Sequence, residues 1–180
     1  MLETQRLLLR RWRDADREPF ARLNADSRVM QFMPACLSRE ESDHLVDRIE
    51  AHFEARGFGL FAVELPRKRT FIGFLGLSVP NFEAHFTPCV EIGWRIAAEH
   101  WNQGFATEGA SAVLVQAFDA LGLDEVVSFT VPANLASRRV MEKIGMSRVP
   151  EDDFEHPRLP EGHLLRKHVL YRIRRSSRMP

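Results

Sequence analysis

Residues 89–110 read CVEIGWRIAAEHWNQGFATEGA, and they combine the patterns of a strand, a glycine turn and a helix start. Apolar side chains alternate with other residues along Cys89–Ile96, which is the two-residue period of a strand. Helical spacing of apolar residues then predicts a helix from Gly104 to a cap at Gly122. A helix N-terminus after a strand and a glycine is a general anion cradle, because its first N–H groups lack partners. An ordinary loop glycine before an amphipathic helix is the alternative.

The residues before this stretch predict further elements of a mixed fold. Ser38 and Glu41 form a capping box, and hydrophobic residues recur after it at helical spacing. The expected elements are a strand in Arg6–Arg13, a helix capped by Asp14 and reaching about Asn24, a helix from Ser38 to about Ala55, a hairpin of Leu60–Leu65 and Thr70–Val79 joined by Pro66–Arg69, and a loop at Pro80–Pro88.

The residues after it alternate between strand and helix patterns. The expected elements are a strand at Glu125–Val131, a short helix at Asn134–Ile144 with Asn134 as its cap, an extended piece at Met146–Val149, a loop at Glu151–Glu161 and a last strand at His168–Ile173. This order predicts a mixed α/β fold around one sheet. No repeat or linker divides the chain, so we expect one domain over residues 1–180, with 174–180 as a frayed basic tail.

Composition limits the class of protein. The 180 residues are 44% hydrophobic, and 25 Lys and Arg balance 25 Asp and Glu, so the net charge is zero. This balance argues against direct nucleic-acid binding and against a disordered chain. Two cysteines suit a reduced cytoplasmic protein rather than a disulfide scaffold. No apolar run approaches the ~20 residues that cross a bilayer, and the start lacks a signal-peptide pattern. We therefore expect no membrane partner.

Four stretches in the right order carry a family resemblance: ETQRLLLR at 3–10, VEIGWRI at 90–96, residues 100–146, and HVLYRI at 168–173. Together they resemble the GNAT superfamily of acetyl-CoA-dependent N-acetyltransferases. In detail the sequence is similar to the RimJ/RimL type, named for enzymes that acetylate the N-termini of ribosomal proteins. The resemblance implies an α/β (α+β) fold with a single mixed, mostly antiparallel central sheet that contains a splayed parallel strand pair and is flanked by helices.

The resemblance also implies acetyl-CoA as cosubstrate and no metal. In the family, the parallel strands hold the pantetheine arm, and backbone N–H groups of a glycine turn hold the pyrophosphate. These strands would be Cys89–Ile96 and Glu125–Val131, and Asn134 matches an asparagine that touches the pantetheine side. Trp101 stands where the broad superfamily has Gln or Arg, but the subgroup tends to have an aromatic residue there. The implied cofactor-binding residues are Ile96, Gln103, Gly104, Phe105, Ala106, Thr107, Asn134 and Ser137.

One departure from the family pattern bears on catalysis. Many GNAT enzymes have a tyrosine seven residues after the asparagine, as proton donor to the thiolate, and Met141 stands there. Ser137 is our candidate for a hydroxyl that hydrogen-bonds the thiolate instead. Glu91 is the best-placed carboxylate for a general base, because it alternates away from the apolar residues of its strand. The alternatives are a salt-bridged surface role for Glu91 and catalysis by positioning alone.

The predicted function is transfer of an acetyl group to a primary amine by direct attack in a ternary complex. A protein N-terminus is the first candidate acceptor. An acetyltransferase for a small-molecule amine and a non-catalytic acyl-CoA-binding module are the alternatives. Either a monomer or a homodimer is compatible with the sequence.

Overall fold

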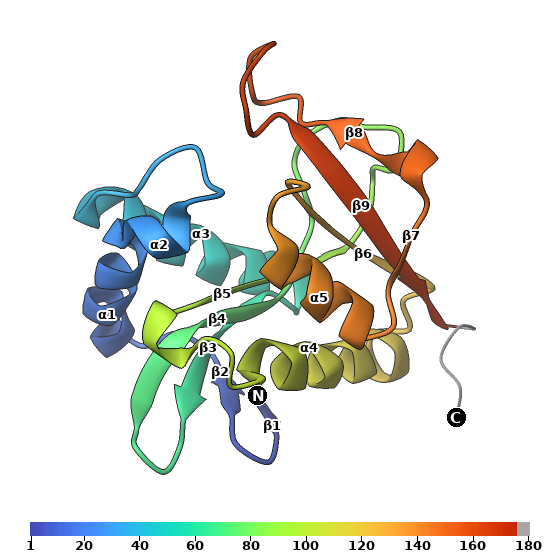
Figure 1. The fold of residues 1–180 in the computed structure, drawn as a ribbon. Helices are drawn as coiled ribbons and strands as arrows, with labels where there is room; N and C mark the ends of the chain where they lie inside the picture. Colours follow the sequence, from blue (N-terminus) through green and yellow to red (C-terminus); the bar gives the residue numbers. More distant parts are fainter. Residues whose placement is uncertain (176–180) are drawn as a thin grey trace. The chain divides into compact units, whose positions relative to one another are not determined.

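The computed structural model describes residues 1–175, and its elements follow the expected alternation (Figure 1). The strands are β1 Leu2–Glu3, β2 Leu8–Arg10, β3 Leu60–Leu65, β4 Thr70–Ser78, β5 Glu91–Ile96, β6 Glu125–Thr130, β7 Ser147–Arg148, β8 Phe154–Glu155 and β9 Lys167–Arg174. The α-helices are α1 Asp14–Ala25, α2 Ser27–Met30, α3 Arg39–Arg56, α4 Phe105–Val115 and α5 Leu135–Lys143. Short 3-10 turns lie at Ala98–His100 and Pro150–Asp152, and a π-helical turn lies at Gln116–Ala120.

The strands form one mixed sheet in the order β1-β2-β3-β4-β5-β6-β9-β7, and β8 pairs with β9. Strands β5 and β6 are parallel, with Glu91 opposite Val127. The pairs β1–β2, β2–β3, β3–β4, β6–β9, β7–β9 and β8–β9 are antiparallel. A mostly antiparallel sheet with one parallel pair and flanking helices confirms the expected fold class.

The chain divides into two compact units. The first holds Met1–Ser78 and Gly93–Val113, and the second holds Val79–Ile92 and the chain from Leu114 onward. The single domain expected from the sequence stays a prediction, so each unit is described by itself.

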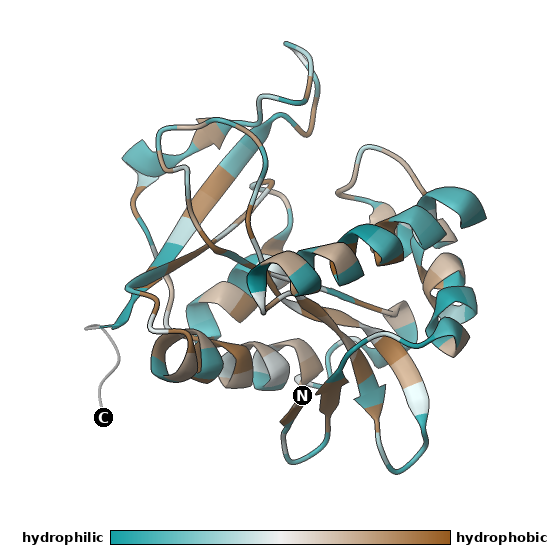
Figure 2. Ribbon diagram, turned by 180° about the vertical axis from the view of Figure 1, so that it is seen from behind, coloured by the Kyte–Doolittle hydropathy of each residue, from teal (hydrophilic) through white to brown (hydrophobic). Residues whose placement is uncertain are grey.

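Aromatic side chains and one amphipathic helix form the core of the first unit. The ring of Trp12 lies 4.8 Å from that of Phe20, and Phe20 lies 5.9 Å from Phe74 on β4. Helix α3 buries the hydrophobic residues Ile49 and Phe53 and exposes most of its charged residues, so the two colours of Figure 2 alternate along it. The expected capping box is confirmed: the Ser38 Oγ accepts from the Glu41 N–H, and the Glu41 carboxylate accepts from the Ser38 N–H.

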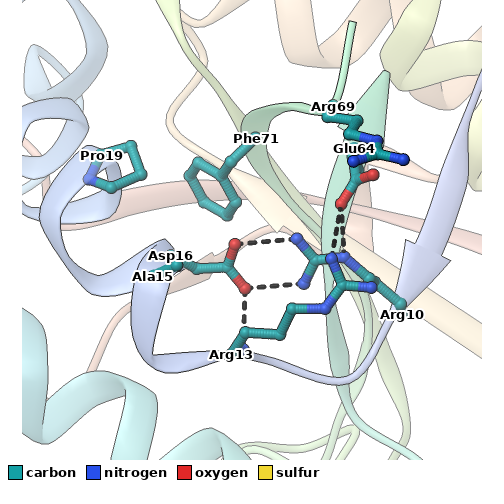
Figure 3. Close-up of a pocket in the computed structure, with 8 residues that line it drawn as sticks. All are labelled: Arg10, Arg13, Ala15, Asp16, Pro19, Glu64, Arg69 and Phe71. Atoms are coloured by element: carbon teal, nitrogen blue, oxygen red, sulfur yellow. Dashed lines mark hydrogen bonds and ion pairs between the residues drawn. The ribbon is translucent and has the colours of Figure 1, made fainter. Parts of the chain in front are cut away.

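A buried ion network joins β2, α1 and β3 in the first unit. The Arg10 guanidinium donates to the Asp16 carboxylate at 2.7 and 2.8 Å and to the Glu64 carboxylate at 2.7 Å. All three residues are buried, at 6%, 3% and 7% exposure. Figure 3 shows them in the wall of a cavity of about 440 Å³, with their charged groups turned toward one another.

This network corrects the expected start of α1. Asp14 is the first helical residue rather than the cap, and Arg13 occupies the cap position. Asp16 instead accepts from the backbone N–H of Arg13 at 2.8 Å. Asp14 and Asp16 both lie in the first turn of α1. The bidentate contact with Arg10 holds the carboxylate of Asp16 in place for this bond.

A long antiparallel ladder organises the second unit. Strands β6 and β9 pair over six residues, from Glu125 opposite Arg174 to Thr130 opposite Val169. Phe86, Val127, Phe154 and Leu170 form a buried hydrophobic cluster on it. Arg174 is thus part of β9 and not of the expected tail, while 176–180 lie outside the described residues.

Several further elements differ from the expectations. The strand expected in Arg6–Arg13 is confined to Leu8–Arg10, and no sequence pattern indicated β1 or the four-residue helix α2. The short strand β8 lies within the expected loop at Glu151–Glu161. The helix that begins at Phe105 changes to a π-helical turn at Gln116 before it ends at Gly122, which has a φ of +66°. Within residues 1–175, no helix is long and apolar enough to span a membrane.

The Arg10 network predicts a large effect of Asp16→Asn on stability. The substitution removes one carboxylate from a buried guanidinium, and breaking such a pair costs about 3–5 kcal/mol. We expect the free energy of unfolding in urea to fall by this amount. Asp14→Asn is the matched control, because Asp14 is fully exposed, and it should change the free energy by less than ~0.5 kcal/mol. Similar values for the two variants would contradict a structural role for the network.

Candidate active site

The predicted anion turn lies at the start of α4, in the first unit. Gly104 is exposed and has a φ of +80°, a conformation that favours glycine. A β-carbon at this position would meet a single described atom, the Arg6 Nη2, at 3.4 Å. The Glu108 N–H donates to the Gly104 carbonyl at 3.0 Å and closes the first helical turn. The N–H groups of Phe105, Ala106 and Thr107 therefore precede the helical hydrogen bonds and are available to an anion.

Side chains and backbone groups before the glycine hold this turn in shape. The Trp101 indole N–H donates to the carbonyl of Ile96, the last residue of β5, at 2.7 Å. The Gln103 side chain donates to the Glu99 carbonyl at 3.1 Å. The side chains of Trp101 and Gln103 thus stabilise the turn through hydrogen bonds within it. The groups available to an anion are the backbone N–H groups of the turn.

Thr4, Arg6 and Glu108 form a clip that no sequence pattern indicated. The Arg6 guanidinium donates to the Gln103 carbonyl at 2.9 Å and to the Glu108 carboxylate at 2.7 Å, and it lies 4.7 Å from the centre of the Phe105 ring. The Thr4 hydroxyl donates to the other Glu108 oxygen at 2.6 Å. This Thr4–Arg6–Glu108 clip places the Arg6 guanidinium, paired with the Glu108 carboxylate, beside the turn. Thr4 and Arg6 lie 104 and 102 positions before Glu108, beyond any local pattern.

Arg95 on β5 is a second cation that no sequence pattern indicated as part of the site. Arg95 donates to the Asn24 side-chain carbonyl at 2.6 Å, and its guanidinium lies 5.3 Å from the centre of the Phe74 ring. Within residues 1–175 it forms no ion pair, and burial lowers the pKa of Arg95 to about 10. Asn24 itself donates to the Ser42 hydroxyl at 2.8 Å, so the end of α1 is joined to both β5 and α3.

In the second unit, Asn134 and Ser137 form the start of α5. The Asn134 Oδ1 accepts from the Ser137 N–H at 3.2 Å, which makes Asn134 the helix cap, and its amide nitrogen donates to the Thr130 hydroxyl at 3.0 Å. A side-chain carbonyl has two lone pairs, so Oδ1 retains one acceptor site for a ligand. Both residues are half-buried.

Met141 and Tyr171, the residues that bear on a tyrosine proton donor, are both buried. Met141, at the family's tyrosine position, is 1% exposed and belongs to the core. The hydroxyl of Tyr171, the one tyrosine of the sequence, donates to the Glu142 carboxylate at 3.0 Å and accepts from the Arg138 Nε at 3.3 Å. Tyr171 is 3% exposed, so its hydroxyl is buried in contacts within its own unit.

Glu91 and Cys89 lie at the start of the parallel strand pair. Glu91 is half-buried opposite Val127, and the Val127 N–H donates to the Val90 carbonyl at 2.9 Å. Burial and, to a lesser extent, the negative charge of Glu91 raise the pKa of the Cys89 thiol to about 11. Cys89 is therefore a neutral thiol at pH 7 and a poor nucleophile. Residues 1–175 contain no group of three or more His, Cys, Asp or Glu placed to hold a metal ion.

The clip makes stability depend on pH through Glu108. Burial alone would raise the pKa of Glu108, but hydrogen bonds from Thr4 and Arg6 outweigh it and lower the pKa below its usual 4.5. The carboxylate therefore stabilises the fold above pH 4.5, and this contribution is lost as the pH falls through the lowered pKa. Between about pH 7 and pH 3, the wild type should lose more free energy of unfolding than Glu108→Gln, as measured in urea. Glu161→Gln, in an exposed loop, is the control and should follow the wild type. Parallel pH dependences of wild type and Glu108→Gln would contradict this account.

Comparisons with known proteins agree with this geometry. The profile of the acetyltransferase (GNAT) domain matches residues 6–147. The uncharacterized N-acetyltransferase YnaD of Bacillus subtilis is 29% identical over 163 residues, which cover 90% of this chain and 89% of that protein. A GNAT-family acetyltransferase from Bacillus anthracis has a TM-score of 0.78 at 28% identity, over 96% of both chains. The ribosomal-protein-S5-alanine acetyltransferase from Vibrio fischeri, 15% identical with a TM-score of 0.76 over 99% of this chain and 98% of that one, shares the fold. These matches confirm the resemblance: the chain belongs to the GNAT family of acetyl-CoA-dependent N-acetyltransferases.

Proposed function

We propose that this enzyme acetylates a primary amine by direct attack on acetyl-CoA in a ternary complex, with a protein N-terminus as the first candidate acceptor. The observation that carries the proposal is the exposed turn at Gly104. Its helix N-terminus and the Arg6 guanidinium offer an anionic ligand both N–H donors and a positive charge. In a member of this family, the pyrophosphate of acetyl-CoA is the anion to which these groups correspond.

The proposed cofactor contacts follow from this assignment. Backbone N–H groups of Gln103–Thr107 bind the pyrophosphate, and the Thr107 hydroxyl is an additional donor. Ile96, at the end of β5, and Asn134, through the free lone pair of its Oδ1, contact the pantetheine arm. The internal bonds of Asn134 support this role, because they fix the direction of its carbonyl before the ligand arrives.

The proposed chemistry uses one hydroxyl and one carboxylate of the second unit. The neutral amine attacks the thioester carbonyl, and a backbone N–H of β5 stabilises the oxyanion. The Ser137 hydroxyl donates to the departing thiolate, a role favoured by the buried and bonded state of Tyr171. The Glu91 carboxylate attracts the protonated amine toward the thioester and is the first candidate for the base.

Two alternatives differ in what they predict for turnover. A small-molecule amine, such as an amino acid, polyamine or antibiotic, would replace the N-terminal peptide as acceptor. A non-catalytic acyl-CoA-binding module would bind acetyl-CoA without releasing free thiol when amines are supplied.

Both cysteines are free thiols, which supports a cytoplasmic location. A monomer and a homodimer are both compatible with the proposal.

The cofactor turn is tested by Gly104→Glu. A carboxylate at the helix N-terminus would occupy the place of the phosphates and repel them, so the Kd for acetyl-CoA should rise at least ~100-fold, which is ~2.7 kcal/mol. Titration calorimetry measures the affinity directly. The matched control is Gly57→Glu, because Gly57 also has a positive φ, of +75°, but ends α3 instead of starting a helix. Unchanged affinity in folded Gly104→Glu protein would refute the phosphate assignment.

The role of Ser137 is tested by Ser137→Ala. Loss of one hydrogen bond to a developing thiolate, about 1.5–3 kcal/mol, should lower kcat about 10- to 150-fold, with little change in the Kd for acetyl-CoA. Release of free thiol reports the rate. Ser147→Ala, at an exposed position in β7, is the control for losing a serine hydroxyl. A Ser137→Ala enzyme with full kcat would show that the thiolate leaves without this donor.

A further inference from the structure

Two histidines of the second unit lie in a cluster of aromatic rings. The His156 and His168 ring centres are 5.1 Å apart. Phe82 lies 4.7 Å from His156, and Phe154 and Phe129 lie 5.5 and 6.0 Å from His168. Neither imidazole has a role in the chemistry derived above. Both are half-buried, so the phenylalanines remove only part of the water around them.

Hydrogen bonds fix which nitrogen of each ring carries the proton. The His168 Nδ1 lies 3.1 Å from the Arg166 carbonyl, which can only accept, so this nitrogen carries the hydrogen. In the neutral ring the His168 Nε2 is then the unprotonated, basic nitrogen. The His156 Nδ1 accepts from the Arg158 N–H at 3.3 Å, so its Nε2 carries the hydrogen. One ring thus offers a base and its neighbour a donor.

The surroundings keep both rings neutral near pH 7. Burial lowers the pKa of His168 below 6.5, against a smaller opposing effect of its bond to the Arg166 carbonyl. Burial also lowers the pKa of His156, and the positive charges of His168 and Arg158 add to this shift.

Further charged or titratable side chains lie beside Phe86, a neighbour of Phe154. His85 lies 5.2 Å from the Phe86 ring and 3.8 Å from the Asp152 carboxylate, and Arg172 lies 6.0 Å from the same ring and donates to Asp152. Cys89 packs against the buried hydrophobic cluster that contains Phe86, as a neutral thiol.

The cluster borders both a cavity and the strand that carries Glu91. Phe82 lines a cavity of about 550 Å³ formed by the loop at 80–88, and the same ring contacts His156. Phe154 also belongs to the buried hydrophobic cluster described above, against which Cys89 packs. Val127, another member of that buried cluster, is the residue opposite Glu91. A ligand in this cavity would therefore approach the histidine pair past Phe82.

We propose that the Nε2 of His168 accepts the proton of the substrate ammonium group, with His156 beside it as a partner that shares the proton. This inference rests on the proposed function and names a further catalytic residue for it. The ammonium gives one proton to His168, and the nitrogen lone pair then forms the C–N bond with the thioester carbonyl. The C–S bond breaks, the thiolate takes the second proton of the nitrogen, and the imidazolium returns its proton to water. In this proposal His168 takes the place of Glu91 as the base, and Glu91 binds the incoming ammonium by charge.

The intrinsic proton affinity of an imidazole favours it over a carboxylate in this step. An α-amino group has a pKa near 7.7–8.0, an unperturbed imidazole about 6.5 and a glutamate carboxyl about 4.3. Proton transfer from the amine is less unfavourable when the base lies closer in pKa. Burial lowers the pKa of His168 and so reduces this advantage.

The test compares His168→Gln with Glu91→Gln in thiol-release assays, using the fastest amine from a panel of N-terminal peptides, amino acids and polyamines. His168→Gln should lower kcat/KM by about 10²–10⁴ and remove the decrease in kcat/KM that the wild type shows as the pH falls through the His168 pKa. Glu91→Gln should raise the KM for the amine and keep that decrease. His44→Gln, an exposed histidine of α3, should match the wild type.

The opposite pattern would overturn the proposal: a pH dependence that survives in His168→Gln and disappears in Glu91→Gln assigns the base to the carboxylate. Nitrogen-15 NMR of the wild-type histidines gives a test that needs no variant. Nδ1–H in His168 supports the proposal, and Nε2–H overturns it. Acetyl-CoA affinity, measured in parallel, separates the two hypotheses. If His168→Gln binds acetyl-CoA normally and retains full turnover, only the histidine assignment fails, whereas a wild type that binds no acetyl-CoA refutes the proposed function itself.

Discussion

The buried guanidinium of Arg10 determines how the first unit is arranged. It lies on β2 and binds one carboxylate at the start of α1 and another on β3. Leaving one of these buried charges without its partner would be costly, so the network fixes the N-terminal end of α1 against the sheet. The other end of α1 bears Asn24, which binds Arg95 on β5, and the Ile96 carbonyl next to Arg95 holds the Trp101 side chain. The order of the turn at Gly104 thus depends on a chain of contacts that begins at Arg10.

The site combines groups that are fixed by the fold with groups that are open to a ligand. The side chains of Gln103 and Asn134 are already bonded within their own units. Backbone N–H groups at the start of α4 are the donors left open to an anion, as the family resemblance implied. A division of this kind lets the anion site form before the ligand binds, because no side chain has to reorganise to create it.

Local patterns in the sequence predicted the elements whose determinants lie within a few residues. The capping box at Ser38 and the cap at Asn134 are of this kind. The sequence could not predict that Asp16 rather than Asp14 serves α1, because that outcome depends on Arg10 and on the tertiary contact it makes. The Thr4–Arg6–Glu108 clip and the histidine pair depend on contacts between segments that no periodicity links. The identity of the acceptor amine also stays a proposal, because the sequence of the loop at 80–88 contains no motif for a particular ligand.

The clip also has a consequence for how the chain folds as it is made. Arg6 leaves the ribosome early, but its partner Glu108 follows 102 residues later. Contacts of such large sequence separation form late, because a long loop must close before they contribute. A nascent chain that ends before Glu108 therefore lacks the carboxylate that holds Arg6 beside the turn at Gly104. The ability to bind acetyl-CoA would then arise only in the second half of synthesis.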